Sequence, residues 1–352
     1  MDIKIITLHS ICNPGSAFQA YALQRYLCHK HHVEIIDYRP DYSRKHPSFL
    51  KNLLRNILFY PFRRKQLKKY DDFINSNMKL TKLCTSYEDL QNADFVADYF
   101  IAGSDQLWNT SFPCGNDDAY YLKFVKRGKK LSYSTSVGKK IIDDFNMIRL
   151  KNELGSFESI AVREKNTSIQ LSSLLNRAVQ WVCDPVFLLK KEEYFKFIDS
   201  QSRFSKPYAF VYLSPKCDNL NKIVDYCKKE GLQIVLGGGF SKRCDYDVFL
   251  HDMGPTEFLS LIYHSKLVVS TSFHATAFCH IFHKNFITML PQKNGERITS
   301  LLELTNMKHR SLDVNQIFDS KVLSEDPNWD IIDKKLDAYI DDSKKWLSEH
   351  LK

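Results

Sequence analysis

The sequence lacks the local patterns that mark several large classes of protein. Its nine cysteines are odd in number and are never spaced as CxxC, so we expect neither a disulfide framework nor a cysteine-rich zinc site. No window approaches the ~20 apolar residues of a membrane span, and the first residues, MDIKIITLHS, lack the apolar region of a signal peptide. The phosphate-binding pattern GxGxxG and the P-loop pattern are also absent. We therefore expect a soluble, cytoplasmic protein in a reducing compartment.

Composition excludes a disordered chain and leaves several kinds of partner open. With 352 residues, of which 43% are hydrophobic and 26% charged, the chain can bury the cores of two globular domains. Fifty Lys and Arg residues against 41 Asp and Glu give a net charge of +9, which suits an acidic small substrate or an anionic surface as well as a nucleic acid. The basic residues are spread along the chain and form no recognised binding module, so we expect no nucleic-acid partner.

Short runs rich in β-branched and aromatic residues alternate with segments of helical spacing. That order predicts an α/β fold of βα units around mostly parallel sheets, and two sheets are favoured over one. We predict a first domain over residues 1–184, a second over 185–328 and an amphipathic closing helix over 329–352. The strand runs are IKIITL, VEIIDY, YFIAG, KLSYST and SIAV in the first half, and YAFVYL, LQIVLGG, KLVVS and NFITML in the second.

One segment departs from this alternation. Residues 48–70 read SFLKNLLRNILFYPFRRKQLKKY, with apolar residues on one helical face and a basic cluster after the proline. The segment is either a solvated helix packed on the first domain or a peripheral contact with a membrane surface. The apolar face consists of Leu53, Leu54, Ile57 and Leu58, and the basic cluster includes Arg63, Arg64, Lys68 and Lys69.

The strongest local signal lies at the start of a predicted helix in the second domain. In LVVSTSFHATAFCHIFHKNF a buried strand turns through three hydroxyl residues into a helix that begins near His274. The N–H groups and dipole of a helix N-terminus favour an anion, and Ser270 and Ser272 can cap the helix or donate to a ligand. His274 is then either a ligand-binding proton donor or a hydrogen-bonded structural histidine. We expect His264, His280 and His283 to be ordinary structural residues, and no metal site.

A second polar cluster follows the predicted strand YFIA. Glycine lets a ligand approach the backbone, and the polar side chains that follow suit sugar hydroxyls or a general base. The alternative is that the aspartate caps a helix. The candidates are Gly103, Ser104, Asp105, Gln106 and Asn109.

Two further candidates also follow predicted strands. Arg163, directly after SIAV, can grip a phosphate or carboxylate, or it can form a surface ion pair with Glu164 or another acid. In CNPGSAFQAYALQ a helix begins near Gly15 and Ser16, where backbone N–H groups can receive a polar ligand, and Gln19 follows one turn later.

These blocks, in this order, resemble the polysaccharide pyruvyl transferase family. The resemblance runs from about Cys12 to Leu302, and GSDQLWN and SFHATAF are its most specific parts. The matching blocks are NPGSAFQAYALQ, FIAGSDQLWN, KLSYSTSVG, AVREKNTS, VCDPVFLL, DMGPTEFLSLI, STSFHATAF and ERITSLLE.

The resemblance implies two Rossmann-like domains facing a cleft, as in GT-B glycosyltransferases, with the acceptor on the first domain, the donor on the second and the terminal helix returning towards the first. It implies transfer of pyruvate from phosphoenolpyruvate, as co-substrate and without a further cofactor, to two hydroxyls of one sugar in a surface polysaccharide or its lipid-linked precursor. Phosphate is released and a cyclic ketal forms.

The resemblance also implies roles for individual residues. His274 matches the family's histidine in SFHG or RLHA and is expected to act as an acid or a phosphate anchor. Asp105 matches the acid in GSDQ and would act as a base or orient the sugar. Arg163 matches the arginine in VRE and would bind the donor, with Arg297 as a further candidate cation.

The sequence departs from the family at three positions. Pro14 stands where an aromatic residue often precedes the glycine, and Ala275 replaces the glycine of SFHG. Ser272 occupies the position of the arginine in RLHA, so one expected donor-binding cation is missing there. A nucleotide-sugar glycosyltransferase with the same fold and a non-catalytic glycan-binding protein are the alternative functions.

Overall fold

The computed structural model describes residues 1–43, 53–213, 218–238, 243–290, 295–313, 316, 318–323 and 326–352, without the side chains of residues 43, 53–58 and 218. Within it the chain forms two compact units. The first consists of Met1–Pro47, Asp71–Leu189 and Asp337–Lys352, and the second of Ser48–Tyr70 and Lys190–Leu336. The chain leaves the first unit after Leu189, whereas the sequence placed that boundary after residue 184.

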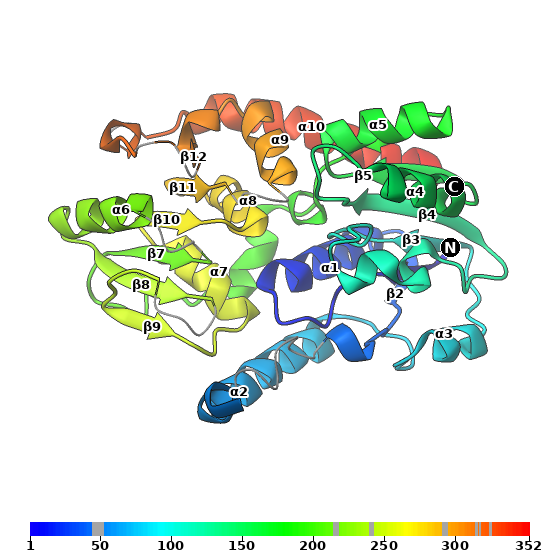
Figure 1. The fold of residues 1–352 in the computed structure, drawn as a ribbon, viewed down its shortest axis with the longest axis horizontal. Helices are drawn as coiled ribbons and strands as arrows, with labels where there is room; N and C mark the ends of the chain where they lie inside the picture. The colour runs from blue at the N-terminus through cyan, green and yellow to red at the C-terminus, as the bar shows by residue number, and fades with distance from the viewer. Residues whose placement is uncertain are drawn as a thin grey trace. The chain divides into compact units, whose positions relative to one another are not determined.

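The first unit is built on a parallel sheet of six strands (Figure 1). The sheet order is β2-β1-β3-β4-β5-β6. Its strands are β1 (Asp2–Ile6), β2 (His32–Ile35), β3 (Tyr99–Ala102), β4 (Lys129–Thr135), β5 (Ser159–Val162) and β6 (Gln180–Trp181). The helices that connect them include α1 (Pro14–Leu27), α3 (Tyr87–Ala93), α4 (Asp144–Leu154) and α5 (Lys165–Leu175).

The second unit repeats this plan with its own parallel sheet, in the order β12-β11-β10-β7-β8-β9. Both sheets carry the strand runs that the sequence predicted, so the α/β prediction is confirmed. The strands are β7 (Tyr208–Tyr212), β8 (Gln233–Gly237), β9 (Val248–Leu250), β10 (Leu267–Ser270), β11 (Phe286–Met289) and β12 (Ser311–Leu312). The helices include α6 (Asp218–Lys229), α7 (Pro255–His264), α8 (Phe273–Ile281) and α9 (Glu296–Leu304).

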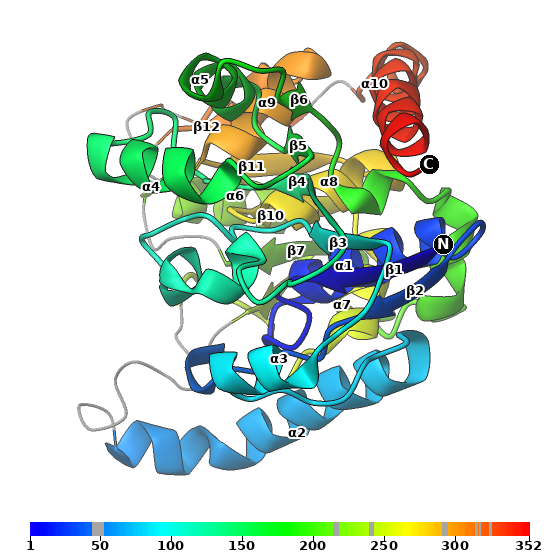
Figure 2. The same cartoon turned by 90° about the vertical axis from the view of Figure 1, so that its right-hand side faces the viewer.

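Two long helices each contribute to both units. Helix α2 (Leu53–Asn77) runs from the second unit into the first, and α10 (Trp329–His350) does the same at the end of the chain (Figure 2). The C-terminal half of α10 packs on the first unit, where the Ser343 hydroxyl accepts a hydrogen bond from the Cys183 N–H at 2.9 Å. No helix in the described part of the chain combines the length and the apolar character needed to cross a bilayer.

The prediction that residues 48–70 pack on the first domain is wrong for the described part of that segment. The side chains of Gln66 and Lys69 bind the second unit, at the Met253 carbonyl (3.1 Å) and the Glu257 carboxylate (2.6 Å). An ion pair and a hydrogen bond therefore fix this segment on the second unit, and the apolar periodicity of the sequence does not predict such contacts. Residues 48–52 and the side chains of Leu53, Leu54, Ile57 and Leu58 lie outside the described residues.

The direction of the strands determines where polar side chains gather. All strand pairs of the first sheet are parallel, so the carboxyl ends of β1, β3, β4 and β5 meet at one edge. Strand β3 is apolar, and its four residues are all buried. Ser104 and Asp105 follow β3, Arg163 follows β5, and these strand ends form the candidate site of the first unit.

Candidate functional site

Asp105 lies at the centre of the candidate site in the first unit, directly after β3. Its backbone φ is +81°, a left-handed conformation that aspartate tolerates better than most residues. The Ser136 N–H donates to its carbonyl at 2.9 Å and fixes this turn against the end of β4. Its carboxylate accepts a hydrogen bond from the Ser16 hydroxyl and another from the Gln106 N–H at 2.8 Å. Asp105 is 6% exposed, so a nearly buried carboxylate is held by a hydroxyl from α1 and by the N–H of the next residue.

Arg163 is engaged in a buried ion pair. One guanidinium nitrogen lies 2.6 Å from the Asp184 carboxylate, and another lies 3.8 Å from Asp105. The Ser104 hydroxyl donates to the same Asp184 carboxylate at 3.0 Å. Burial alone would lower the pKa of Arg163, but the charges of Asp184, Asp105 and Glu164 outweigh it and raise that pKa. The guanidinium is therefore always charged, and its charge is already balanced by carboxylates of the protein.

Glu164 is a buried carboxylate that the sequence reasoning named only as a surface partner for Arg163. It is fully buried; one of its oxygens accepts a hydrogen bond from the Ser136 hydroxyl, and the other has no hydrogen-bond partner among the described residues. Asp184 was missed as well. Both residues lie within blocks shared with the family, AVREKNTS and VCDPVFLL, which is the one signal that points to them.

The predicted ligand-binding loop at the start of α1 makes its main hydrogen bonds within the protein. The Asn13 side chain caps the helix and accepts from the N–H groups of Gly15 (2.9 Å) and Ser16 (3.3 Å). Gln19 is buried and donates to the Thr7 hydroxyl and the Ser16 carbonyl, each at 2.9 Å. The loop's direct contribution to the cluster is the Ser16 hydroxyl on Asp105.

Gln106 and Asn109 shape the turn after Asp105. The Asn109 amide donates to the Gln106 side-chain oxygen at 2.7 Å. Gly138 has φ +73°, and a Cβ at that position would lie 2.3 Å from the same Gln106 oxygen, so any other residue there would strain the backbone and displace the Gln106 side chain. Gly103 is similarly close to β1, since a Cβ on it would lie 3.1 Å from the Thr7 Cβ. These residues position the backbone around Asp105.

The second unit holds the predicted helix N-terminus at His274. Ser272 caps α8 by accepting from the Ala275 N–H (3.4 Å), and the Ser270 hydroxyl accepts from the Ser272 N–H (2.9 Å). His274, the second residue of α8, is 4% exposed, and its ring lies 5.2 Å from the Phe273 ring. The Arg297 guanidinium lies over the Phe273 ring, 6.0 Å from its centroid. The positive end of the α8 dipole and the Arg297 cation together make this part of the unit suited to an anion.

His280 in α8 and His283, two residues past the end of that helix, have structural partners. His280 is buried between the Thr276 carbonyl (2.8 Å) and the Thr305 hydroxyl (3.2 Å), and burial lowers its pKa to about 4. His283 stacks on Trp329, with ring centroids 4.9 Å apart, and pairs with Asp333. In the part of the chain that the structure describes, no group of three or more His, Cys, Asp or Glu side chains is arranged to hold a metal ion.

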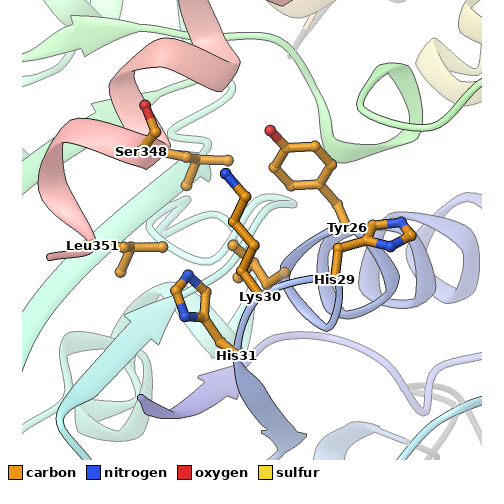
Figure 3. A pocket seen from close by; sticks show the side chains of 8 residues that line it. Tyr26, His29, Lys30, His31, Ser348 and Leu351 are labelled. Carbon is orange, nitrogen blue, oxygen red and sulfur yellow. The ribbon is translucent and has the colours of Figure 1, made fainter.

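A hollow of about 90 Å³ lies elsewhere on the first unit, between the ends of α1 and α10 (Figure 3). Leu27, Leu347 and Leu351 line it together with Tyr26 and Lys30. The hollow is at the C-terminal end of α1, whereas Ser16 contacts Asp105 from the N-terminal end, and a helix of this length separates its ends by roughly 20 Å. The hollow is therefore not part of the cluster around Asp105.

The structure thus brings the predicted residues together in two groups. Asp105, Ser104, Arg163 and Ser16 form one hydrogen-bonded network in the first unit, with Asp184 and Glu164 added to it. Ser270, Ser272, His274 and Arg297 surround the start of α8 in the second.

Comparison with known proteins decides the family. A family model for polysaccharide pyruvyl transferase matches residues 13–292, well over half of the chain and including Asp105, Arg163 and His274. The chain belongs to the polysaccharide pyruvyl transferase family. The family resemblance seen in the sequence is therefore confirmed, and a polysaccharide pyruvyl transferase acts on a sugar acceptor. No protein of curated function matches the sequence.

Solved structures agree with the fold expected for such a transferase. The UDP-N-acetylglucosamine 2-epimerase of Rickettsia bellii aligns with 99% of this chain and 95% of its own, with a TM-score of 0.56 and 10% identity. A Listeria monocytogenes protein provisionally assigned the same activity aligns with 99% of this chain and 94% of its own, with a TM-score of 0.52 and 8% identity. At these identities the likeness concerns the fold alone, and it confirms the predicted GT-B-like class.

Proposed function

We propose that this polysaccharide pyruvyl transferase takes pyruvate from phosphoenolpyruvate and attaches it to two hydroxyls of one sugar. The product is a cyclic ketal on a surface polysaccharide or its lipid-linked precursor, and phosphate is released. The observation that carries the proposal is the family match over residues 13–292, which includes the hydrogen-bonded cluster at Asp105 and the helix start at His274.

The donor belongs on the second unit. Phosphoenolpyruvate carries a phosphate and a carboxylate, so its site needs cations and N–H donors rather than further carboxylates. The N-terminus of α8 and the Arg297 guanidinium supply these, and His274 is placed to anchor the phosphate or to deliver a proton.

Arg163 takes a different role from the one expected from the sequence. Three carboxylates, Asp184, Asp105 and Glu164, act on this one guanidinium, so its surroundings are unfavourable for a doubly anionic donor. We assign Arg163 as a positioning residue that holds Asp184 and Asp105 in place, and we place the acceptor sugar at Asp105. Asp105 accepts a proton from an acceptor hydroxyl or orients that hydroxyl, with the Ser16 hydroxyl fixing the carboxylate.

The reaction then proceeds in two additions at one carbon. A general acid, for which His274 is the candidate, protonates the methylene carbon of the donor, and an oxocarbenium-like centre develops at the neighbouring carbon. The first sugar hydroxyl attacks that carbon and loses its proton to Asp105. The carbon–oxygen bond to phosphate breaks with its electron pair going to the phosphate. The second hydroxyl attacks and loses its proton, so one proton ends in the new methyl group and the other is available to the phosphate.

Heat protection by phosphoenolpyruvate tests how these roles are divided. A ligand that binds only the folded state raises the melting temperature, so phosphoenolpyruvate should protect the protein. His274→Ala and Arg297→Ala should lose this protection, whereas Asp105→Asn should retain it and lose turnover. Protection by UDP-N-acetylglucosamine but not by phosphoenolpyruvate would contradict the proposal and favour a nucleotide-sugar glycosyltransferase.

A further inference from the structure

Helix α2 presents a basic and aromatic stripe to solvent. Tyr60, Arg64 and Lys68 are spaced four residues apart, so they lie on one face of the helix. All three are exposed, and Tyr60 is 62% exposed. Pro61, the next residue, is also exposed, so the aromatic end of the stripe adjoins further apolar surface.

The opposite face of α2 packs on the second unit. The rings of Phe59 and Phe62 lie 5.4 and 5.2 Å from the His251 ring. Further along the helix, Gln66 and Lys69 bind Met253 and Glu257. Residues of this face are spaced by three or four positions and lie about half a turn from Tyr60, Arg64 and Lys68. One face of α2 is therefore held against the second unit by these contacts, and Tyr60, Arg64 and Lys68 lie on the opposite face.

Charge on α2 is distributed in the same way. Five basic residues and no acidic residue occur between Phe62 and Tyr70: Arg63, Arg64, Lys65, Lys68 and Lys69. The carboxylates of Asp252 and Glu257 pair with Lys65 (3.0 Å) and Lys69 (2.6 Å), which belong to the inner side and its border. The outer stripe itself carries the basic side chains of Arg64 and Lys68, and the acidic residues Asp71 and Asp72 follow it in the sequence.

We propose that this stripe, Tyr60, Arg64 and Lys68, binds the surface of an anionic lipid bilayer. Basic side chains are attracted to anionic headgroups, and tyrosine is one of the two residues that concentrate at the membrane–water interface, because its ring is apolar and its hydroxyl polar. An exposed aromatic residue at one end of a basic helix face is typical of helices that lie in this interface. This surface role does not rest on the proposed pyruvyl transfer, since it uses none of the residues around Asp105 or His274.

Flotation of the full-length protein with lipid vesicles tests the proposal. Wild type should float with phosphatidylcholine vesicles that contain phosphatidylglycerol, and not with phosphatidylcholine alone. Each basic residue near an anionic surface strengthens binding by roughly fivefold, so Arg64→Gln/Lys68→Gln should weaken partition by roughly 30-fold at low salt. Tyr60→Ser should weaken it as well. The matched control is Lys140→Gln/Lys151→Gln, which removes two exposed lysines from the first unit and should change partition less than twofold.

Each other result overturns the proposal. Failure of wild type to bind anionic vesicles at low salt would do so, and so would equal binding by the wild type and Arg64→Gln/Lys68→Gln. An equal loss in the control pair would show that net charge alone acts. Tighter binding of a DNA duplex, lost in Arg64→Gln/Lys68→Gln, would assign the stripe to nucleic acid instead. Unchanged melting temperatures show that the substituted proteins are folded.

Discussion

Replacing Arg163 by methionine removes the cation that lies close to both Asp184 and Asp105, and we expect it to destabilise the first unit strongly. The side chains of Arg163 and Asp184 are 2% and 0% exposed, and their atoms are 2.6 Å apart. Breaking a buried ion pair by removing one partner leaves an uncompensated buried charge and costs about 3–5 kcal/mol. The methylene part of methionine preserves most of the packing, so this loss is mainly electrostatic.

Urea unfolding followed by tryptophan fluorescence measures this loss. Three of the four tryptophans, Trp108, Trp181 and Trp346, lie in the first unit, so fluorescence reports chiefly on that unit. With a denaturant dependence of about 2 kcal/mol per molar urea, the loss moves the midpoint down by about 1.5–2.5 M. Asp184→Asn in the Arg163→Met background should recover part of it, because the unpaired carboxylate is then gone.

Arg149 provides the matched control. Its ion pair with Asp118 has side chains 20% and 40% exposed at 3.4 Å, and such solvent-exposed pairs contribute about 0–1 kcal/mol. Arg149→Met should therefore shift the midpoint by less than about 0.5 M. A loss below about 1 kcal/mol for Arg163→Met, or one no larger than that of Arg149→Met, would refute the assignment of Arg163 as a buried structural cation.

Three further predictions concern the site, the terminal helix and the second unit. Asp105→Asn should keep the fold and lower turnover by about 10²- to 10⁴-fold in a steady-state assay, whereas near-normal turnover would remove Asp105 from the chemistry. Ser343→Ala leaves the buried Cys183 N–H without its acceptor and should lower the free energy of unfolding in urea by about 1–3 kcal/mol. Ser348 is exposed on the same helix, so Ser348→Ala should lower it by less than about 0.5 kcal/mol. Equal effects of the two substitutions would contradict the α10 contact. The buried His280 has a folded-state pKa of about 4 against an ordinary value of about 6.5, so the stability due to its neutral form is complete above pH 6.5 and is lost as the pH falls towards 4. Between pH 7.5 and 5 we expect the protein to lose about 2 kcal/mol of stability, which would be seen as faster hydrogen exchange in α8. His280→Gln should lose less over the same pH range. An equal loss in both proteins would show that His280 is not the group responsible.

The sequence predicts the strands and the grouping of their ends well, for a physical reason. Runs such as YFIA and SIAV are buried on both faces, and a parallel sheet places the residues that follow them at one edge. Polar residues that follow the strands are therefore predicted to lie close together, and the side chains of Asp105 and Arg163 are 3.8 Å apart.

Long-range pairing is what the sequence does not reveal. Arg163 and Glu164 are adjacent, and no periodicity shows that both are buried or that Asp184, beyond the two-residue strand β6, is the partner of Arg163. The packing surface of α2 is equally hidden in the sequence, because it depends on long-range contacts. Lys69 and Glu257, which form one of them, are 188 positions apart in the sequence. A helical pattern identifies the helix and not the surface on which it packs.

Incubation of the purified protein with phosphoenolpyruvate and candidate glycans tests the central claim most directly. Inorganic phosphate and the mass of the glycan are followed together. The account predicts one phosphate released for each glycan that gains the mass of pyruvic acid less one water, with neither change in Asp105→Asn. Phosphate release without that mass gain, or transfer of a sugar from a nucleotide sugar to the same glycans, would contradict it.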